Sequence, residues 1–112
     1  MEIKFFTKDI KLVDALKIYI EKKIQVFAEK HLKNILEILE VRVELNVDHH
    51  HCHGKVQRIE TIFYAPKQIL IAEESANDIY TAIDMIVPKL ETQVEKYKNK
   101  VVSKNRKNIA KN

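Results

Sequence analysis

Residues 78–100 read DIYTAIDMIVPKLETQVEKYKNK, and this stretch decides how the rest of the chain must pack. Its apolar residues recur at alternating steps of three and four, which is the spacing of one face of an α-helix. They are Ile79, Ile83, Ile86, Leu90, Val94 and Tyr97, followed by Val101. Such a stripe has to be buried, so the stretch predicts a long helix packed on a hydrophobic core.

A second stripe of the same stretch is polar and basic. Lys89, Gln93, Lys96 and Lys100 follow the same helical spacing on a different face, with Lys98 to one side. The last seventeen residues contain seven Lys or Arg and no Asp or Glu, within a chain whose net charge is +4. One end of the molecule is therefore strongly positive, and a polyanion is the expected partner.

The N-terminal part of the chain predicts a strand followed by a helix. Residues 2–6 alternate polar and apolar, and an apolar stripe at helical spacing then runs over residues 11–30. Thr7 or Asp9 is expected to cap this helix. Lys22, Lys23 and Lys30 lie off its apolar stripe, as lysines do on any solvated helix face.

The middle of the chain changes to a period of two, which is typical of half-buried strands. Strands are predicted over residues 39–48, 58–65 and 69–74, with turns at the single glycine, Gly54, and at Pro66. Asn77 is expected to cap the second helix.

The element order β-α-β-β-β-α predicts an α+β fold. Two helices pack on one face of a four-stranded mixed sheet, because only one face of each strand is consistently apolar. A helical crossover makes the first two strands parallel, and the two tight turns make the later strands antiparallel. At 112 residues we expect one folded domain, residues 1–101, and a flexible basic tail, residues 102–112, disordered beyond about Ser103.

The sequences of the two predicted helices resemble those of a known family. The string DIYTAID, followed by Lys89 and Leu90, by Gln93 and by KYKNK at 96–100, is similar to the second helix of the ribosome hibernation-promoting factor and ribosome-associated inhibitor family, also called the sigma-54 modulation protein family. Ala15, Leu16 and Lys23 match its first helix, and the resemblance covers about residues 1–101. The chain departs from the family pattern at Val26, Pro88 and Thr92, and Pro88 is expected to kink the second helix.

This resemblance implies a bacterial ribosome hibernation factor of the short form. Such a protein binds the small ribosomal subunit and its rRNA in the mRNA and tRNA channel, and reversibly blocks translation in slow-growing, stationary-phase or stressed cells. It also implies a topology close to that of double-stranded RNA-binding domains and a monomer off the ribosome. The residues expected to bind RNA are Lys22, Lys23, Lys30, Lys89, Gln93, Lys96, Lys98 and Lys100.

Two other functions stay open on the sequence. One is a free-standing double-stranded RNA-binding module, which would recognise A-form shape. The other, ranked lower, is a zinc-binding protein that uses the loop of His49, His50, His51, Cys52 and His53. Side chains alternate in an extended loop, so these ligands do not converge, and no metal or other cofactor is expected.

Other classes of protein are disfavoured. There is no glycine-rich phosphate loop and no nucleophile with a base at motif spacing, so we expect no enzyme and no small-molecule substrate. Asp78 and Asp84 are interpreted as acidic residues in the first turns of a helix, whose amino end favours negative charge. The chain has no apolar run long enough to span a bilayer, no secretory signal and one cysteine, which favours a soluble cytoplasmic protein without a membrane partner.

Overall fold

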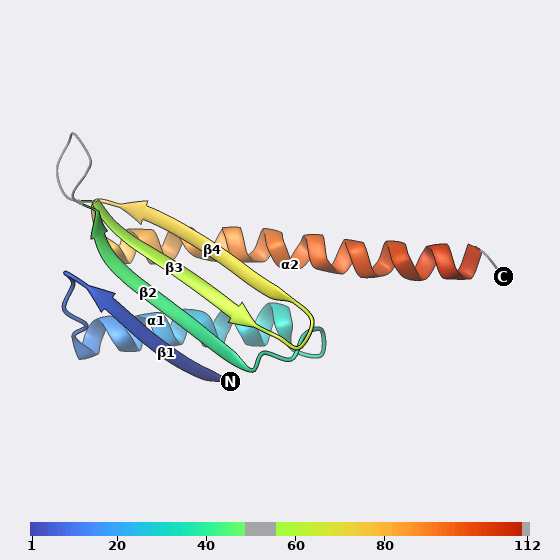
Figure 1. Ribbon diagram of the computed structural model, residues 1–112, viewed down its shortest axis with the longest axis horizontal. Helices are drawn as coiled ribbons and strands as arrows, with labels where there is room; N and C mark the ends of the chain where they lie inside the picture. The colour runs from blue at the N-terminus through green and yellow to red at the C-terminus, as the bar shows by residue number, and fades with distance from the viewer. Residues whose placement is uncertain (49–55, 111–112) are drawn as a thin grey trace.

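The computed structural model describes residues 1–48 and 56–110; for Asp48 and residues 101–110 it describes the backbone alone. Its elements, in chain order, are β1 (Glu2–Lys8), α1 (Asp14–Phe27), a π-helical turn η1 (Ala28–Leu32), β2 (Glu40–Asp48), β3 (Val56–Tyr64), β4 (Ile69–Ala76) and α2 (Ile79–Ala110) (Figure 1). No helix within the described ranges is both long and apolar enough to cross a membrane.

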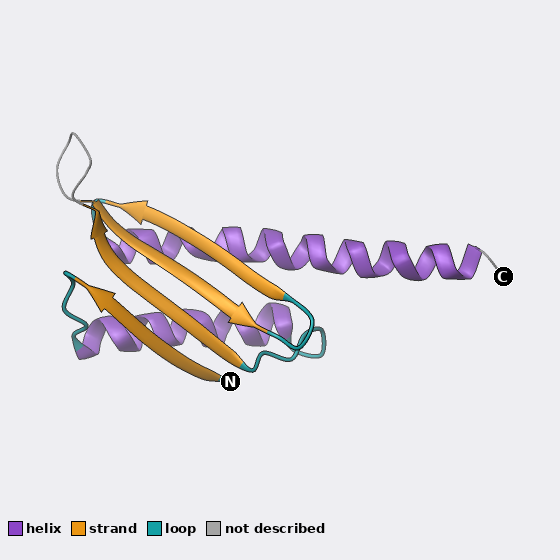
Figure 2. Cartoon of the chain, viewed as in Figure 1, coloured by secondary structure: helices purple, strands orange, loops and turns teal. Residues whose placement is uncertain are grey.

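The four strands form one mixed sheet in the order β1-β2-β3-β4. Strand β1 is parallel to β2, while β2 with β3 and β3 with β4 are antiparallel. Both helices lie on the same side of this sheet (Figure 2). The predicted α+β class and its element order are therefore confirmed.

The core lies between the sheet and the two helices. From α2 it takes the predicted apolar stripe: Ile79, Ile83, Ile86, Leu90 and Val94 are each at most 6% exposed. Alternating strand residues face this stripe, among them Val41, Val43, Leu45, Ile59, Phe63 and Leu70, and α1 adds Leu16, Ile20, Ile24 and Phe27. Removing this apolar surface from water is the main force that holds the helices on the sheet.

Helix α1 starts later than its hydrophobic pattern indicated. Its N-cap residue is Val13, which provides no side-chain hydrogen bond, so the expectation that Thr7 or Asp9 caps the helix is wrong. The chain turns first at Asp9, whose φ of 62° is in the left-handed region that Asp tolerates better than most residues. At the other end, α1 passes directly into η1.

Helix α2 is capped by Asp78 and not by Asn77, so that expectation is also wrong. The Asp78 carboxylate accepts hydrogen bonds from the Thr81 amide and the Thr81 hydroxyl, each at 3.2 Å, and the Asp78 carbonyl accepts the first helical bond from Ala82. Asp78 is thus the N-cap residue, which directly precedes the first helical turn.

Helix α2 is continuous through Pro88 and extends to Ala110 (Figure 1). The backbone is therefore helical over most of the segment 102–112, where we expected irregular chain. After Pro88 the sequence has neither glycine nor proline to end the helix, and Lys and Arg are good helix formers. The role of this segment as a separate basic tail stays a prediction. The predicted turn at Gly54 lies outside the described residues.

The Asp78 cap predicts a difference between two neighbouring substitutions. Asp78→Ala removes the acceptor for the Thr81 amide and should lower the free energy of unfolding by about 1 kcal/mol, the usual value of an N-cap. Asn77→Ala changes an exposed residue one position earlier and should have a much smaller effect. Urea unfolding followed by circular dichroism measures both; equal losses would contradict the assignment of Asp78 as the cap.

Pro88 gives a second stability prediction. Proline has no amide hydrogen, so the Asp84 carbonyl lacks the helical donor that residue 88 would otherwise supply. Pro88→Ala should restore this bond and raise the melting temperature, with the stabilisation bounded by the roughly 3 kcal/mol that proline costs in a free helix. Thermal unfolding measures it, and an unchanged or lower melting temperature would show that packing of the ring outweighs the missing bond.

Candidate nucleic-acid interface

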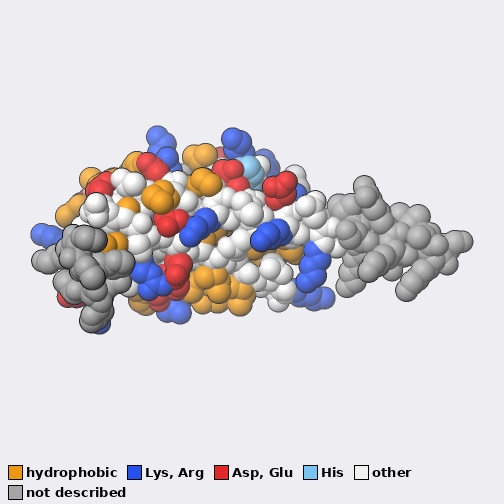
Figure 3. Space-filling view, turned by 90° about the horizontal axis from the view of Figure 1, so that it is seen from above, with side chains coloured by type: hydrophobic (Ala, Val, Ile, Leu, Met, Phe, Trp, Pro, Cys, Tyr) orange, Lys and Arg blue, Asp and Glu red, His pale blue; other side chains and the backbone are white. Residues whose placement is uncertain are grey.

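On the face of the domain seen from above, the described basic side chains are not gathered in one continuous patch (Figure 3). Seen from above, Lys and Arg alternate with Asp and Glu over the body of the domain (Figure 3). The residues expected to bind RNA separate into a group between the two helices and a group along α2 beside β4.

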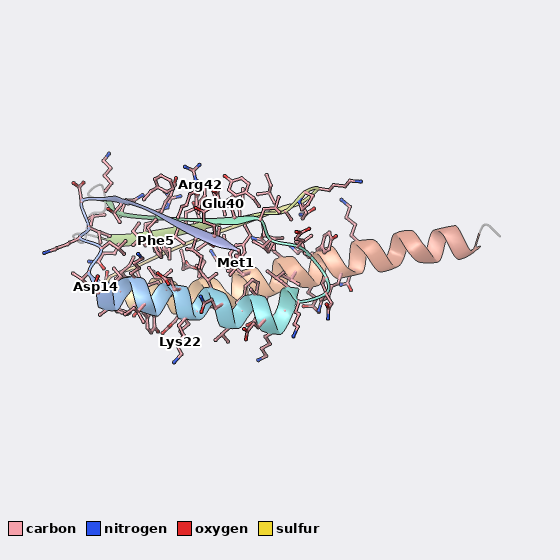
Figure 4. The ribbon with its side chains drawn as sticks, turned by 90° about the horizontal axis from the view of Figure 1, so that it is seen from below. Met1, Phe5, Asp14, Lys22, Glu40 and Arg42 are labelled. Carbon is pink, nitrogen blue, oxygen red and sulfur yellow. The ribbon has the colours of Figure 1, made fainter. Side chains whose placement is uncertain are left out.

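A groove of about 540 Å³ lies between α1 and α2. The amines of Lys22, Lys23 and Lys30 line it, together with His31. Lys22 lies on the outer side of α1 and points away from the sheet (Figure 4). The groove therefore opens on the helix side of the molecule, and three of the predicted lysines meet there.

The lining of this groove is partly apolar, and its α2 side carries acids. Val26, Val87 and Pro88 line it beside Asp84 and Glu91. Val26 is 53% exposed, which leaves a hydrophobic strip between the amines. The departures from the family pattern at Val26 and Pro88 thus fall in the groove itself.

Tyr19, Lys23 and Asp84 join the two helices at one side of the groove. The Tyr19 hydroxyl donates to Asp84 Oδ1 at 2.5 Å, and Lys23 Nζ lies 3.4 Å from the same oxygen. The lysine amine also lies 5.4 Å from the centre of the Tyr19 ring, within the range of a cation–π contact. Lys23 is consequently held in one place, although its side chain remains 42% exposed.

The same cluster shifts the protonation of its members. The hydrogen bond from Tyr19, followed by the Lys23 charge, lowers the pKa of Asp84 against the opposing effect of partial burial. The hydrogen bond to Asp84 is the main cause that raises the pKa of Lys23. At neutral pH the pair is an ionised carboxylate and an ammonium group, so Asp84 is a partner of Lys23 and not simply an acidic residue of the first turn.

His31 makes a second polar connection between the helices. Its Nε2 lies 3.7 Å from Glu91 Oε1, and its ring lies tilted against that of Phe27, a core residue, with the ring centres 5.4 Å apart. Sequence reasoning missed Tyr19, Asp84 and His31 as members of the groove. Tyr19 lies within the apolar stripe of the first predicted helix, and neither Asp84 nor His31 carries a local signal in the sequence.

Lys89 and Gln93 face the outer edge of β4. Gln93 Oε1 accepts from the Ile71 amide at 3.0 Å, and Gln93 Nε2 donates to the Ile71 carbonyl. Lys89 Nζ donates to the Glu73 carbonyl at 2.9 Å and lies 3.0 Å from Glu74 Oε2. These two side chains satisfy backbone groups that an edge strand would otherwise leave open.

Lys96 and Lys100 continue along the same face of α2. With Gln68, Leu70 and Tyr97 they line a shallow cavity of about 220 Å³ next to the β3–β4 turn, and both lysines are exposed. Lys98 is exposed as well and lies outside this cavity. The second stripe therefore divides into an inner part bonded to β4 and an outer part with free access to solvent.

The histidine-rich loop at 49–53 lies outside the described residues. In the part of the chain that the structure does describe, no group of three or more His, Cys, Asp or Glu side chains is arranged to hold a metal ion.

Comparison with protein families gives a match over nearly the whole chain. The family described as "Sigma 54 modulation protein / S30EA ribosomal protein" matches residues 3–102. The chain is 28% identical over 104 residues to the "Ribosome hibernation promoting factor" of Azotobacter vinelandii, covering 93% of this chain and 89% of that protein.

Two further relatives are named "Ribosome hibernation promotion factor". The protein of Staphylococcus aureus (strain COL) is 31% identical over 99 residues, and that of Lactococcus lactis subsp. cremoris (strain MG1363) is 29% identical over 103 residues. Each alignment covers 88% of this chain but only 48% and 50% of the respective relative. The chain thus spans about half the length of these two proteins.

Solved structures support the same assignment. The Thermus thermophilus Protein Y N-terminal domain superposes with a TM-score of 0.69 at 31% identity, over 87% of this chain and 99% of that one. A ribosomal subunit interface protein from Coxiella burnetii superposes with a TM-score of 0.72 at 21% identity, over 88% and 99%, and shares the fold. On the match over residues 3–102, the chain belongs to the Sigma 54 modulation protein / S30EA ribosomal protein family, which confirms the resemblance seen in its sequence.

Proposed function

We propose that this protein is a ribosome hibernation factor that binds the small ribosomal subunit in the mRNA and tRNA channel and reversibly blocks translation. The observation that carries the proposal is the groove between α1 and α2, which is lined by lysines of α1 and η1 and by an apolar strip. Membership of the family and the names of the relatives support it.

The groove suits a folded RNA surface. Lysines on a rigid scaffold can contact several phosphates at once, and such contacts position a protein without reading base sequence. Lys23 is already held by Tyr19 and Asp84, so it would lose little conformational freedom on binding. The acids Asp84 and Glu91 lower the charge of the groove, which favours a defined phosphate arrangement over indiscriminate attraction.

The lysines near the C-terminal end of α2 extend the proposed contact. Lys96, Lys98 and Lys100 are exposed, and together they offer three further amines. Lys89 and Gln93 belong to the same proposed surface, but they also bond to β4. We therefore expect Lys89 and Gln93 to contribute to stability as well as to binding.

Inhibition would be steric. The proposed function requires no catalysis and no bound cofactor, and we expect a cytoplasmic protein that is monomeric off the ribosome. Titration against vacant small subunits and against a plain RNA duplex tests the central claim. Comparable affinity for both would instead favour the free-standing duplex-binding module.

The outer lysines give a prediction about salt dependence. Changing Lys96, Lys98 and Lys100 together to Gln should weaken binding to small subunits and lower the slope of log affinity against log salt by roughly two, because each lost phosphate contact removes somewhat under one unit. Thermal stability should be unchanged, since these side chains are exposed.

A matched control removes three charges at the other end of the domain. Lys8, Lys11 and Lys17 are also exposed, and changing them to Gln alters net charge by the same amount. This variant should keep most of the affinity and the slope. Equal losses in the two triple variants would mean that net charge alone governs binding.

The C-terminal segment gives a further prediction. Residues 102–112 carry Lys104, Arg106, Lys107 and Lys111 and no acid, so they should add electrostatic attraction to rRNA. Deleting them should reduce affinity for small subunits roughly tenfold at low salt, with the difference shrinking as salt rises and screening increases. Equal affinity of the full and truncated chains at low ionic strength would contradict this role.

A further inference from the structure

No element in the described part of the chain covers the face of the sheet opposite the helices (Figures 2 and 4). Both helices pack on the other side, and Glu40 and Arg42 lie on the outer side of the sheet, away from Lys22 of α1 (Figures 2 and 4). The strand register arranges the side chains of this outer sheet face in rows that run across all four strands.

Two neighbouring rows form an apolar patch on β3 and β4. Ile62 pairs with Ile71, and Tyr64 pairs with Ile69. The two pairs are two residues apart along each strand and so lie on the same face. Ile69 and Ile71 are 49% and 50% exposed, and Figure 3 shows hydrophobic side chains gathered along the lower edge, where the sheet lies. A contiguous exposed patch of this kind on a small domain is typical of an interaction site.

A partner must approach this patch from its face and not from its edge. Gln93 already bonds both the amide and the carbonyl of Ile71, and Lys89 bonds the carbonyl of Glu73. Addition of another strand to β4 is therefore blocked at these two residues. The side chains of Ile69 and Ile71 stay accessible.

The row beside the patch is acidic. Glu44 pairs with Glu60, and Glu60 pairs with Glu73, which places three carboxylates side by side. Arg58 forms ion pairs with Glu73 and, at 3.8 Å, with Glu60, so this group of four side chains keeps a net negative charge. Partial burial and the charge of Glu44 raise the pKa of Glu60, as expected where carboxylates crowd.

Two basic residues on the β1 side of this face, Lys4 and Arg42, already have partners, and Lys8 lies in the row beyond the acidic row. Lys4 Nζ lies 2.8 Å from Glu40 Oε1, and the Arg42 guanidinium lies over the Phe6 ring at 4.4 Å. A second copy of this face would bring its own three carboxylates against the acidic row, while its Lys4, Arg42 and Arg58 already have partners. Nucleic acid would be repelled by the same row.

We propose that the outer sheet face binds a basic amphipathic helix of another protein. Its apolar side would cover the patch of Ile62, Tyr64, Ile69 and Ile71, and its Lys or Arg side chains would meet Glu44, Glu60 and Glu73. The groove between the helices lies on the opposite side of the domain, so the two surfaces can be occupied together. This inference goes beyond the proposed function and does not depend on it.

A titration with a synthetic peptide tests this surface. The probe is a Leu and Lys peptide with Leu at helical spacing, added to the ¹⁵N-labelled full chain. Amide shifts should concentrate on β3 and β4, and the α1 amides should stay unchanged. A peptide with Ser in place of Leu, and one with Glu in place of Lys, should each bind at least about tenfold more weakly, because each lacks one of the two required contacts.

Two double variants locate the site. Ile69→Ser with Ile71→Ser, and Glu60→Gln with Glu73→Gln, should each raise the Kd for the peptide at least about tenfold. The matched controls are Ile18→Ser with Val26→Ser on α1, which are 64% and 53% exposed, and Glu29→Gln with Glu95→Gln, which are also exposed. Both controls should leave the Kd unchanged, and circular dichroism verifies that each variant is folded.

Four outcomes would overturn the proposal. The first is amide shifts confined to the α1–α2 groove. The second is equal binding of the Ser-substituted peptide, which would indicate charge attraction alone. The third is equal loss in the control variants. The fourth is self-association of the full chain, measured by sedimentation and abolished by the Ile69 and Ile71 changes, which would identify a second copy as the occupant.

Discussion

The contact between α2 and β4 meets two separate requirements of this fold. The apolar side of α2 fills the core above the sheet through Ile86, Leu90 and Val94. On an adjacent face of the same helix, Lys89 and Gln93 bond the open backbone groups of the edge strand. Because both sets of contacts come from one helix, α2 cannot move along β4 by a turn without exposing apolar surface and leaving edge groups unsatisfied.

The position of α2 in turn sets the geometry of the groove. With α2 fixed on the sheet, Asp84 and Glu91 are fixed as well. Helix α1 is joined to Asp84 through Tyr19 and Lys23, and η1 is joined to Glu91 through His31. The lysines of α1 thus stand at a defined distance from the acids and the apolar strip of α2. The geometry of the candidate interface therefore depends on the contact between α2 and β4.

The sequence allowed the fold to be predicted because the relevant information is local. The three-and-four spacing of residues such as Ile83 and Leu90 identifies a buried helix, and the alternation around Val43 identifies a half-buried strand. Element boundaries were less accurate. Asn77 and Asp78 are both good caps, and only the three-dimensional path of the chain decides between them.

The site could be predicted only in part, because it depends on contacts between distant residues. Periodicity placed Lys89 and Lys96 correctly on one face of a helix, but it could not tell that β4 occupies the inner half of that face. Likewise, Tyr19 and Asp84 are 65 positions apart, and neither residue carries a local sign of the bond between them.

The parallel pairing of β1 imposes an order on how the domain assembles. Within the sheet β1 has one neighbour, β2, and Glu2 pairs with Glu40. The first strand of the chain therefore cannot pair until α1 and the loop after it have brought β2 beside it. Strands β2, β3 and β4 form a meander of sequential neighbours, whose pairing closes shorter loops and costs less chain entropy. Assembly should therefore begin in the meander, with β1 added late. Weakened contacts of β1 would then act mainly on the rate of unfolding and leave the rate of folding nearly unchanged.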